Sequence, residues 1–209
     1  MNKPITIHTS RTIMSSELIE VLDFPKGNFD YFQIMQNNVF NKRTESSKKK
    51  TINYLTQLYS FNNEDLKFKC LQDYWSKVEN TEKPLLALLF AASKDYLIEE
   101  SVEFVKSVKY NTKASIEDFE LNINQHHPDR FTPKTLRSVS QNVASSWKQA
   151  SYIIGKMKNI RTERTPSYTA TAFAFLMAYL DDSRGDFLFQ HTSVKALDAT
   201  KEEILNLLK

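Results

Sequence analysis

Apolar residues recur along most of the chain at intervals of three or four positions, the spacing of one face of an α-helix. Stripes of this kind cover residues 29–40, 52–59 and 66–78, and short polar stretches separate them. Two denser apolar runs, 84–92 and 170–180, are shorter than the roughly 20 residues that cross a bilayer. We therefore predict a mainly α protein that does not contact a membrane and whose core contains these two runs.

Side chains that cap helices indicate where several of these helices begin. Ser46 or Ser47 is expected to cap the helix that carries the 52–59 stripe, because a serine hydroxyl accepts the free N–H groups of the first turn. A helix that begins at Pro84 is expected to run to about Tyr96. Further starts are expected at Ser115 with Asp118, at Ser167, and at Thr200 with Glu203.

The clearest start signal is Thr132 followed by Pro133, a capping hydroxyl before a proline that suits the first helical position. Gly155 is a plausible end for this helix, and residues 156–164 are expected to form a loop or a short hairpin. One face of the helix forms an apolar stripe of Leu136, Val139, Val143, Trp147 and Ala150. The opposite face carries Lys134, Arg137, Ser138, Gln141, Asn142, Ser145 and Lys148.

The composition excludes several classes of function. Gly27, Gly155 and Gly185 are the only glycines among 209 residues, whereas a phosphate-binding loop or a dinucleotide fingerprint needs several glycines close together. The single cysteine, Cys70, excludes a disulfide framework and a zinc ribbon. The first 16 residues lack the apolar segment of a secretory signal, so we expect a cytoplasmic protein.

Positive charge is concentrated in two segments, although the formal net charge is only +3. Residues 42–50 carry a charge of +4 and residues 130–164 carry +7, which leaves −8 for the remainder. Such a distribution suits a protein with one face for a polyanion. Two ordinary solvated faces are the alternative, because charge runs usually face solvent.

The polar face of the helix after Thr132 has the residue types of a recognition helix. Arginine and lysine bind guanine edges or phosphates, and glutamine and asparagine pair with adenine. The basic segment that follows would lie where the wing of a winged-helix protein meets DNA.

Other polar residues do not form a recognisable catalytic or metal site. Adjacent imidazoles such as His126 and His127 point in different directions and lack further ligands at familiar spacing. Cys70 lies in an apolar stripe and is expected to be a small core residue. We therefore expect no enzyme activity, no cofactor and no metal. Carboxylates that converge from separate elements to bind a metal would instead support a metal-dependent nuclease.

Parts of the sequence resemble the BrxA proteins, which are small accessory components of bacterial BREX phage-resistance systems. The resemblance rests on residues 37–44, 46–50 and 52–59, and more loosely on residues 131–147 and 184–186. It implies a helical, non-enzymatic protein that binds double-stranded DNA beside the other subunits of the system.

These observations lead to a prediction of fold and function. We expect a helical bundle over residues 1–125 and a helix-turn-helix or winged-helix-like unit over residues 126–209, with one continuous domain as the alternative. The two basic segments are expected to fold next to each other and to bind double-stranded DNA in a shared groove, mainly through phosphates. The alternative is an adaptor that joins defence subunits without binding DNA. The candidate DNA contacts are Lys42, Arg43, Lys48, Lys49, Lys50, Lys134, Arg137, Gln141, Lys148, Lys156, Lys158, Arg161 and Arg164.

Overall fold

The computed structural model describes residues 5–25 and 27–207, which form a mainly helical protein with one two-stranded sheet in that part of the chain. The first elements are α1 (Ser15–Leu22), α2 (Tyr31–Gln36), α3 (Glu45–Tyr59), α4 (Leu66–Trp75), α5 (Lys83–Ala92), α6 (Tyr96–Ser107), α7 (Ile116–His126) and α8 (Pro133–Gln149). The later elements are β1 (Ile153–Ile154), β2 (Ile160–Arg161), α9 (Tyr168–Leu180), the 3-10 helix η1 (Gly185–Gln190), α10 (Thr192–Lys195) and α11 (Lys201–Leu207).

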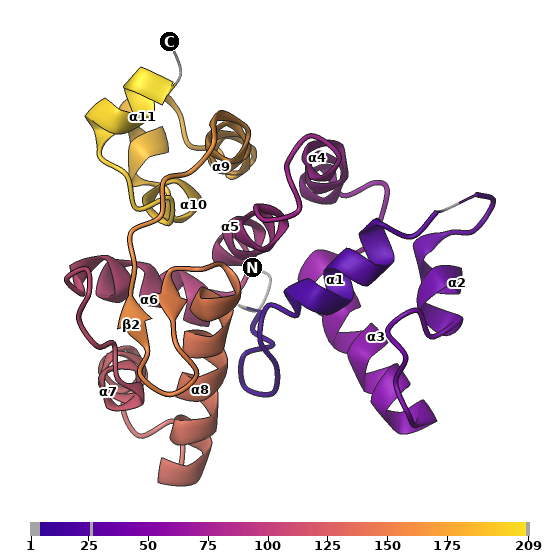
Figure 1. Cartoon of the computed structure of the whole chain (residues 1–209), viewed down its shortest axis with the longest axis horizontal. Helices are drawn as coiled ribbons and strands as arrows, with labels where there is room; N and C mark the ends of the chain where they lie inside the picture. Colours follow the sequence, from indigo (N-terminus) through magenta and orange to yellow (C-terminus); the bar gives the residue numbers. More distant parts are fainter. Residues whose placement is uncertain (1–4, 26, 208–209) are drawn as a thin grey trace.

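Helix α5 lies at the centre of the molecule (Figure 1). Every residue from 85 to 92 is buried, and the helix packs against α1, α3, α4, α6, α8, α9 and α10. A helix that is apolar on all sides has to be enclosed by other elements. The prediction of a core helix over residues 84–92 is therefore confirmed.

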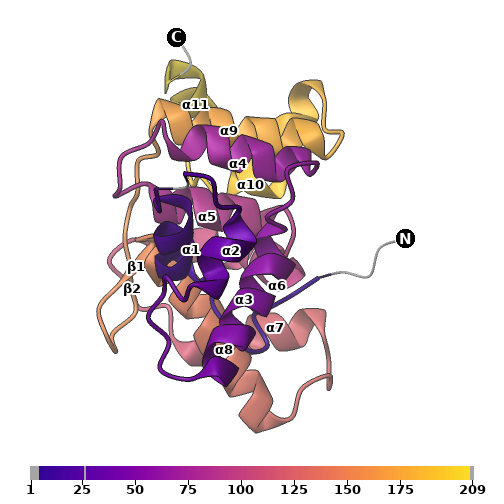
Figure 2. The ribbon, with the colours of Figure 1, turned by 90° about the vertical axis from the view of Figure 1, so that its right-hand side faces the viewer.

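Three groups of elements surround α5 (Figures 1 and 2). Helices α1 to α3 lie at the right of Figure 1, and α6 to α8 lie with the small sheet at the lower left. Helices α4, α9, α10 and α11 form the upper layer in Figure 2. Helix α9, the second apolar run, buries Phe173 and Met177 in this layer but exposes Tyr168 and Tyr179. None of the helices in the described residues has the length and apolar character needed to cross a membrane.

Most of the capping signals act as the sequence indicates. The Ser115 hydroxyl accepts the N–H of Asp118, whose carboxylate accepts the N–H of Ser115 in return. The Thr132 hydroxyl accepts the N–H of Thr135 at the start of α8. Ser167 caps α9 in the same way. These contacts are local, which is why a sequence pattern predicts them.

Two helix boundaries differ from the prediction. Thr44, rather than Ser46 or Ser47, caps α3, because its hydroxyl accepts the N–H of Ser47. The helix that was expected to reach Tyr96 ends at Ala92, since the Asp95 carboxylate accepts the N–H of Leu97 and starts α6. In the first case the cap lies just before the expected one, and in the second the expected helix is interrupted so that Tyr96 begins a new helix.

Gly155 does not end α8, which stops at Gln149. It lies instead in the turn between β1 and β2, with a φ angle of +86° that favours glycine. Residues 156–164, expected to form a loop or a short hairpin, begin in this turn and include β2.

One cluster of buried apolar side chains runs from Ile7 to Ile204. The expected division between residues 125 and 126 falls at the end of α7, and α7 packs along α8 on the other side of that division. The hydrophobic core therefore continues across the position at which two regions were expected.

Candidate nucleic-acid interface

The elements from α6 to β2 form a compact unit at the lower left of Figure 1. Helices α6, α7 and α8 pack against one another, and β1 pairs antiparallel with β2 directly after α8. Lys113, in the link between α6 and α7, forms an antiparallel bridge with Ile160 of β2. Backbone hydrogen bonds further join residues 111–114 to residues 159–161. The hairpin is thus held on its β2 side by the link that precedes α7.

Helix α8 buries one face and exposes the other. Val139, Val143 and Trp147 are buried, as the apolar stripe predicts. The N-terminal half of the opposite face exposes Lys134, Arg137, Ser138 and Gln141 to solvent. Near the C-terminal end Lys148 is half-buried, and its ammonium donates a hydrogen bond to the carbonyl of Lys156 over 3.2 Å. Lys148 therefore connects α8 to the hairpin turn.

Arg137 is exposed but already paired. Its guanidinium lies 2.6 Å from the Glu117 carboxylate and 3.2 Å from that of Glu120, both on α7. The hydrogen bond to Arg137 lowers the pKa of Glu117, and the same pair raises the pKa of Arg137. Because the pair is exposed, it is weak enough for a phosphate to compete with it.

Lys156 and Lys158 lie in the turn of the hairpin, and both are exposed. Neither ammonium has a carboxylate within ion-pair distance among the described residues, and the same is true of Lys134 at the start of α8. These three lysines are free to bind an anion.

Arg161 lies in the core and is not a candidate contact, which corrects the prediction. Its side chain has no exposed surface and forms an ion pair with Asp198. The guanidinium also donates to the carbonyls of Val105 and Tyr152, over 3.1 and 3.3 Å. β2 directs this side chain inward, so the charge holds the sheet against α6 instead of facing a ligand.

Arg164 is half-buried, and its guanidinium donates to two backbone carbonyls. These are the carbonyls of Ala150, over 2.9 Å, and of Thr81, over 3.4 Å. The side chain links the end of α8 to the loop before α5, which leaves it little freedom to bind an external phosphate.

The first basic segment, residues 42–50, lies around the N-terminal end of α3 and is partly neutralised. Lys42 pairs with Glu17 of α1 over 2.8 Å. Lys48 pairs with Glu45 over 2.9 Å and donates to the carbonyl of Gln36. The exposed cations of this segment that have no ion-pair partner among the described residues are Arg43, Lys49 and Lys50.

The two basic segments do not lie side by side as expected. The N-terminal end of α3 lies at the lower right of Figure 1, whereas α8 and the hairpin lie at the lower left. Residues 6–14 run between them. The Tyr59 hydroxyl of α3 donates to the carbonyl of Ile13 over 2.5 Å, and Asn142 and Gln149 of α8 bond to the same segment from the other side. Within the described residues, the two basic segments therefore form two separate cationic areas and not one shared groove.

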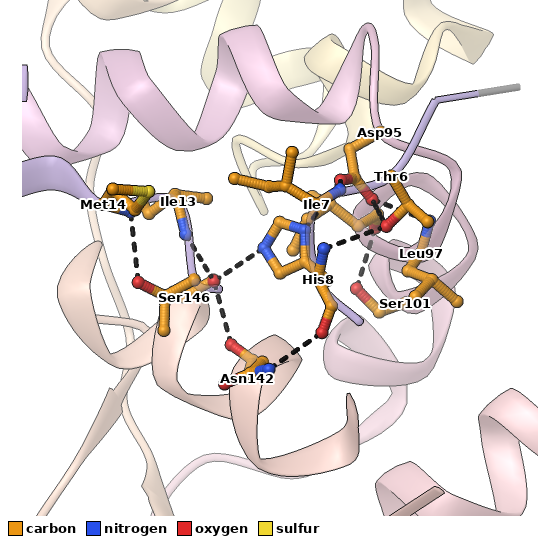
Figure 3. Close-up of polar contacts among 12 residues, drawn as sticks. Thr6, Ile7, His8, Ile13, Met14, Asp95, Leu97, Ser101, Asn142 and Ser146 are labelled. Carbon is orange, nitrogen blue, oxygen red and sulfur yellow. Dashed lines mark hydrogen bonds and ion pairs between the residues drawn. The ribbon is translucent and has the colours of Figure 1, made fainter. Parts of the chain in front are cut away.

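A buried polar cluster at the centre of this junction was missed by the sequence analysis (Figure 3). His8 Nδ1 lies 2.8 Å from the Asp95 carboxylate, and His8 Nε2 lies 2.8 Å from the Ser146 hydroxyl. The same carboxylate accepts the N–H of Ile7 and the hydroxyl of Thr6. The sequence signal for Asp95 is its position directly before an apolar helix, but nothing near His8 indicates a partner 87 residues away.

The order of groups in this cluster is that of a Ser–His–Asp triad, but its environment is not that of an active site. His8, Asp95 and Ser146 all have no exposed surface, so a substrate cannot reach the serine in this structure. The serine hydroxyl also donates to the carbonyl of Asn142 over 2.9 Å and accepts the N–H of Ile13. With these bonds made, Ser146 is a connector between α8 and the N-terminal segment.

The charge of Asp95 is stabilised by its neighbours. Burial alone would raise the pKa of this carboxyl, but the adjacent His8 imidazole and the N–H of Ile7 outweigh burial and hold the pKa below its usual value. The carboxylate is therefore the centre of the hydrogen-bond network that attaches residues 6–8 to the start of α6.

The other polar residues considered above do not converge on one site. His126 Nδ1 lies 2.9 Å from the carbonyl of Asn122, whereas His127 Nε2 lies 2.9 Å from the Glu100 carboxylate. Cys70 is half-buried, and burial raises the pKa of its thiol. Within the described residues, no group of three or more histidine, cysteine, aspartate or glutamate side chains is arranged to hold a metal ion.

Comparison of this chain with protein-family models, with curated proteins and with solved structures gives no match.

Proposed function

We propose that the chain is a non-enzymatic protein that binds double-stranded DNA through a winged-helix arrangement of α6, α7, α8 and the β1–β2 hairpin. The observation that carries this proposal is the order of elements. A helix, a bridging residue, two further helices and a hairpin follow one another, and the bridging residue Lys113 pairs with the second strand of the hairpin. In this arrangement α8 is the recognition helix and the hairpin is the wing.

The side chains of α8 and the hairpin suit contacts to a duplex. Gln141 is exposed on the outer face of α8 and has the two-sided amide that pairs with adenine. Lys134, Lys156 and Lys158 are exposed cations for phosphates. Arg137 also contacts a phosphate if that phosphate displaces Glu117 and Glu120. Lys148 supports the hairpin through its hydrogen bond to the Lys156 carbonyl.

The cations at the start of α3 form a second, weaker contact in this proposal. Arg43, Lys49 and Lys50 lie apart from α8, so a long duplex or a second duplex is needed to reach them. Lys42 and Lys48 take a smaller part because Glu17 and Glu45 already neutralise them.

The resemblance to the BrxA proteins supports the same function and suggests its setting. We propose that the chain acts beside other subunits of a BREX-type phage-defence system and has no catalytic step of its own. The buried position of Ser146 agrees with a structural role for the one triad-like cluster described above.

The salt dependence of duplex binding tests this proposal. A 25-base-pair duplex is titrated with the purified protein at several salt concentrations, and the logarithm of the affinity is plotted against that of the salt. We expect a straight line whose slope is about −0.9 for each neutralised phosphate, or roughly −4 in total. A matched variant, Lys134→Gln with Lys158→Gln, is expected to make this slope about 1.8 less negative.

Absence of binding to the duplex at 50 mM salt would overturn the proposal. A slope that stays the same in the double variant would leave DNA binding intact but would place the contacts elsewhere on the protein. Lys77→Gln, at an exposed ion pair on the α4 side, serves as the control and is expected to leave the slope unchanged.

A protein-interaction adaptor is the second candidate, and exposed aromatic residues favour it. Phe29 and Phe32, at the start of α2, leave 48% and 57% of their surfaces in solvent. The two residues are three positions apart in the sequence, and exposed large apolar side chains are typical of protein contacts. Under this alternative, substitution of Phe29 and Phe32 by serine would abolish association with the other defence subunits. The wild-type protein itself would not bind the duplex.

A further inference from the structure

The turn of the β1–β2 hairpin presents one apolar side chain directly to solvent. Met157 is 86% exposed, more than any other large apolar side chain in the described residues. It takes no part in the buried cluster that forms the core. Packing within the chain therefore does not account for a methionine at this position.

The base of the hairpin holds this turn firmly in place. Arg161 is buried in its ion pair with Asp198, and backbone bonds fix residues 159–161 against residues 111–114. On the other side, the Lys148 ammonium donates to the carbonyl of Lys156, directly before Met157. Gly155, with its φ of +86°, permits the tight reversal. Met157 thus projects from a turn that is anchored on both sides to the rest of the fold.

The residues beside Met157 carry positive charge. Lys156 and Lys158 flank it, both exposed, and residues 155–159 contain no acidic side chain. An apolar group between two cations matches the surface of the DNA minor groove, where base edges lie between two rows of phosphates. The groove is about 6 Å wide, so it admits the tip of a hairpin more readily than a helix.

From these observations we propose that Met157 inserts into the minor groove as a wedge that partly unstacks one base step. This inference rests on the proposed DNA binding and adds to it a bent, locally opened duplex as the form that is bound. Apolar side chains, methionine included, act in this way in proteins that kink DNA toward the major groove. The flexible thioether adapts its shape to the opened step. Flexible pyrimidine–purine steps such as TA should therefore be preferred at this position.

The test uses a duplex with 2-aminopurine at a central TA step, whose fluorescence rises when the base loses its stacking partner. At saturating concentrations of the wild-type protein we expect a clear rise in fluorescence. Met157→Ala is expected to bind about fivefold more weakly, to keep the wild-type salt slope and to lose the rise even at saturation. Met157→Leu, which keeps an apolar side chain, should retain most of the rise.

Two matched variants separate the wedge from its surroundings. Lys158→Gln should make the salt slope about 0.9 less negative but keep the rise at saturation, because it removes a phosphate contact alone. Leu66→Ala, which alters another exposed apolar residue on α4, should change neither quantity.

The outcomes distinguish the two proposals. If the wild-type protein binds the duplex and Met157→Ala gives the same rise at saturation, the wedge is wrong and DNA binding stands. If the wild-type protein does not bind the duplex at 50 mM salt, both proposals fail.

Discussion

Both basic segments of this chain concentrate positive charge in the sequence. In the structure, carboxylates neutralise that charge to different extents in the two segments. At the start of α3, Lys42 and Lys48 pair with carboxylates, and only the outward positions keep free charges. Along α8 and the hairpin, Lys134, Lys156 and Lys158 are free, and they extend from elements that are anchored in the core. The count of cations in a segment therefore does not show how many can bind a phosphate.

The contrast is sharpest within the hairpin itself. Lys158 and Arg161 are three positions apart, yet one is exposed in the turn and the other is fully buried. Arg161 sits where β2 meets α6, and its charge is matched by Asp198 and by backbone carbonyls. The buried Arg161 therefore anchors β2, the strand that follows the turn in which Lys158 is exposed.

The N-terminal segment bonds to both regions, in addition to their shared packing against α5. Residues 6–14 bond to α3 through Tyr59 and to α8 through Asn142 and Ser146, with His8 and Asp95 at the centre. Substitutions in this segment should therefore affect both regions, whereas substitutions in either basic segment should affect that region alone.

The largest effect is expected from His8→Ala. This change leaves the buried Asp95 carboxylate without its imidazole partner, and loss of one member of a buried pair costs about 3–5 kcal/mol of unfolding free energy. Urea denaturation followed by circular dichroism measures the change. As a control, His126→Ala on the exposed end of α7 should stay within about 0.5 kcal/mol of wild type. Equal urea midpoints for His8→Ala and wild type would contradict a structural role for the cluster.

The next largest effect on stability is expected at Arg161 and not at Lys158, the other hairpin cation compared above. Arg161→Met should lower the unfolding free energy by about 3 kcal/mol, because Asp198 then stays buried without a cation. Lys158→Met, the same substitution at an exposed position, should leave the urea midpoint unchanged and weaken duplex binding instead. Similar midpoints for both variants would show that the burial of Arg161 has no energetic consequence.

A comparison of charge reversals in the two regions tests which of them binds DNA. Lys134→Glu with Lys156→Glu is expected to weaken duplex binding about thirtyfold at 100 mM salt, because two phosphate contacts become repulsive. Lys49→Glu with Lys50→Glu, which makes the same change in charge at α3, should weaken it only about threefold. Fluorescence anisotropy with a labelled duplex measures both. The reverse order of effects would assign the main contact to α3.

A smaller effect is expected from acid. The pKa of Asp95 is lowered in the folded protein, so the unfolded chain binds the proton more tightly and protonation favours unfolding. The stabilisation is complete above about pH 5 and decreases as the pH falls below about 4. Thermal melts between pH 3 and 6 measure it. Asp95→Asn should melt at a lower temperature at pH 6, and its melting temperature should change less on acidification than that of wild type.

The local structure followed from the sequence wherever the signal was short. The capping pairs at Ser115 and Thr132 and the buried stripe of α8 depend on residues a few positions apart, and the structure contains them. The error at Thr44 arose because neighbouring hydroxyl residues could each cap the helix, whereas at Asp95 the sequence prediction missed a break between two helices. Helix-forming tendencies and caps act over one or two turns, so they are visible in a linear pattern.

The candidate interface was only partly visible in the sequence. The sequence predicts its helix, allows a loop or a short hairpin after it, and places the positive charges of Lys134 and Lys158 there. The burial of Arg161 and the pairing of Arg137 do not, because Asp198 and Glu117 are distant in the chain. A charge run shows where cations are, while the folded surroundings decide whether each one is already neutralised.

The sequence by itself determined that this protein is mainly helical, where several of its helices begin, and which face of α8 is buried. Only the tertiary structure placed His8 against Asp95 and Ser146, set the two basic segments apart, and left Met157 exposed on a braced turn. The physical reason is the separation along the chain of the residues that take part in each kind of interaction. Hydrophobic periodicity and caps are read from neighbours along the chain, whereas burial and ion pairing depend on residues that meet only after the helices pack around α5.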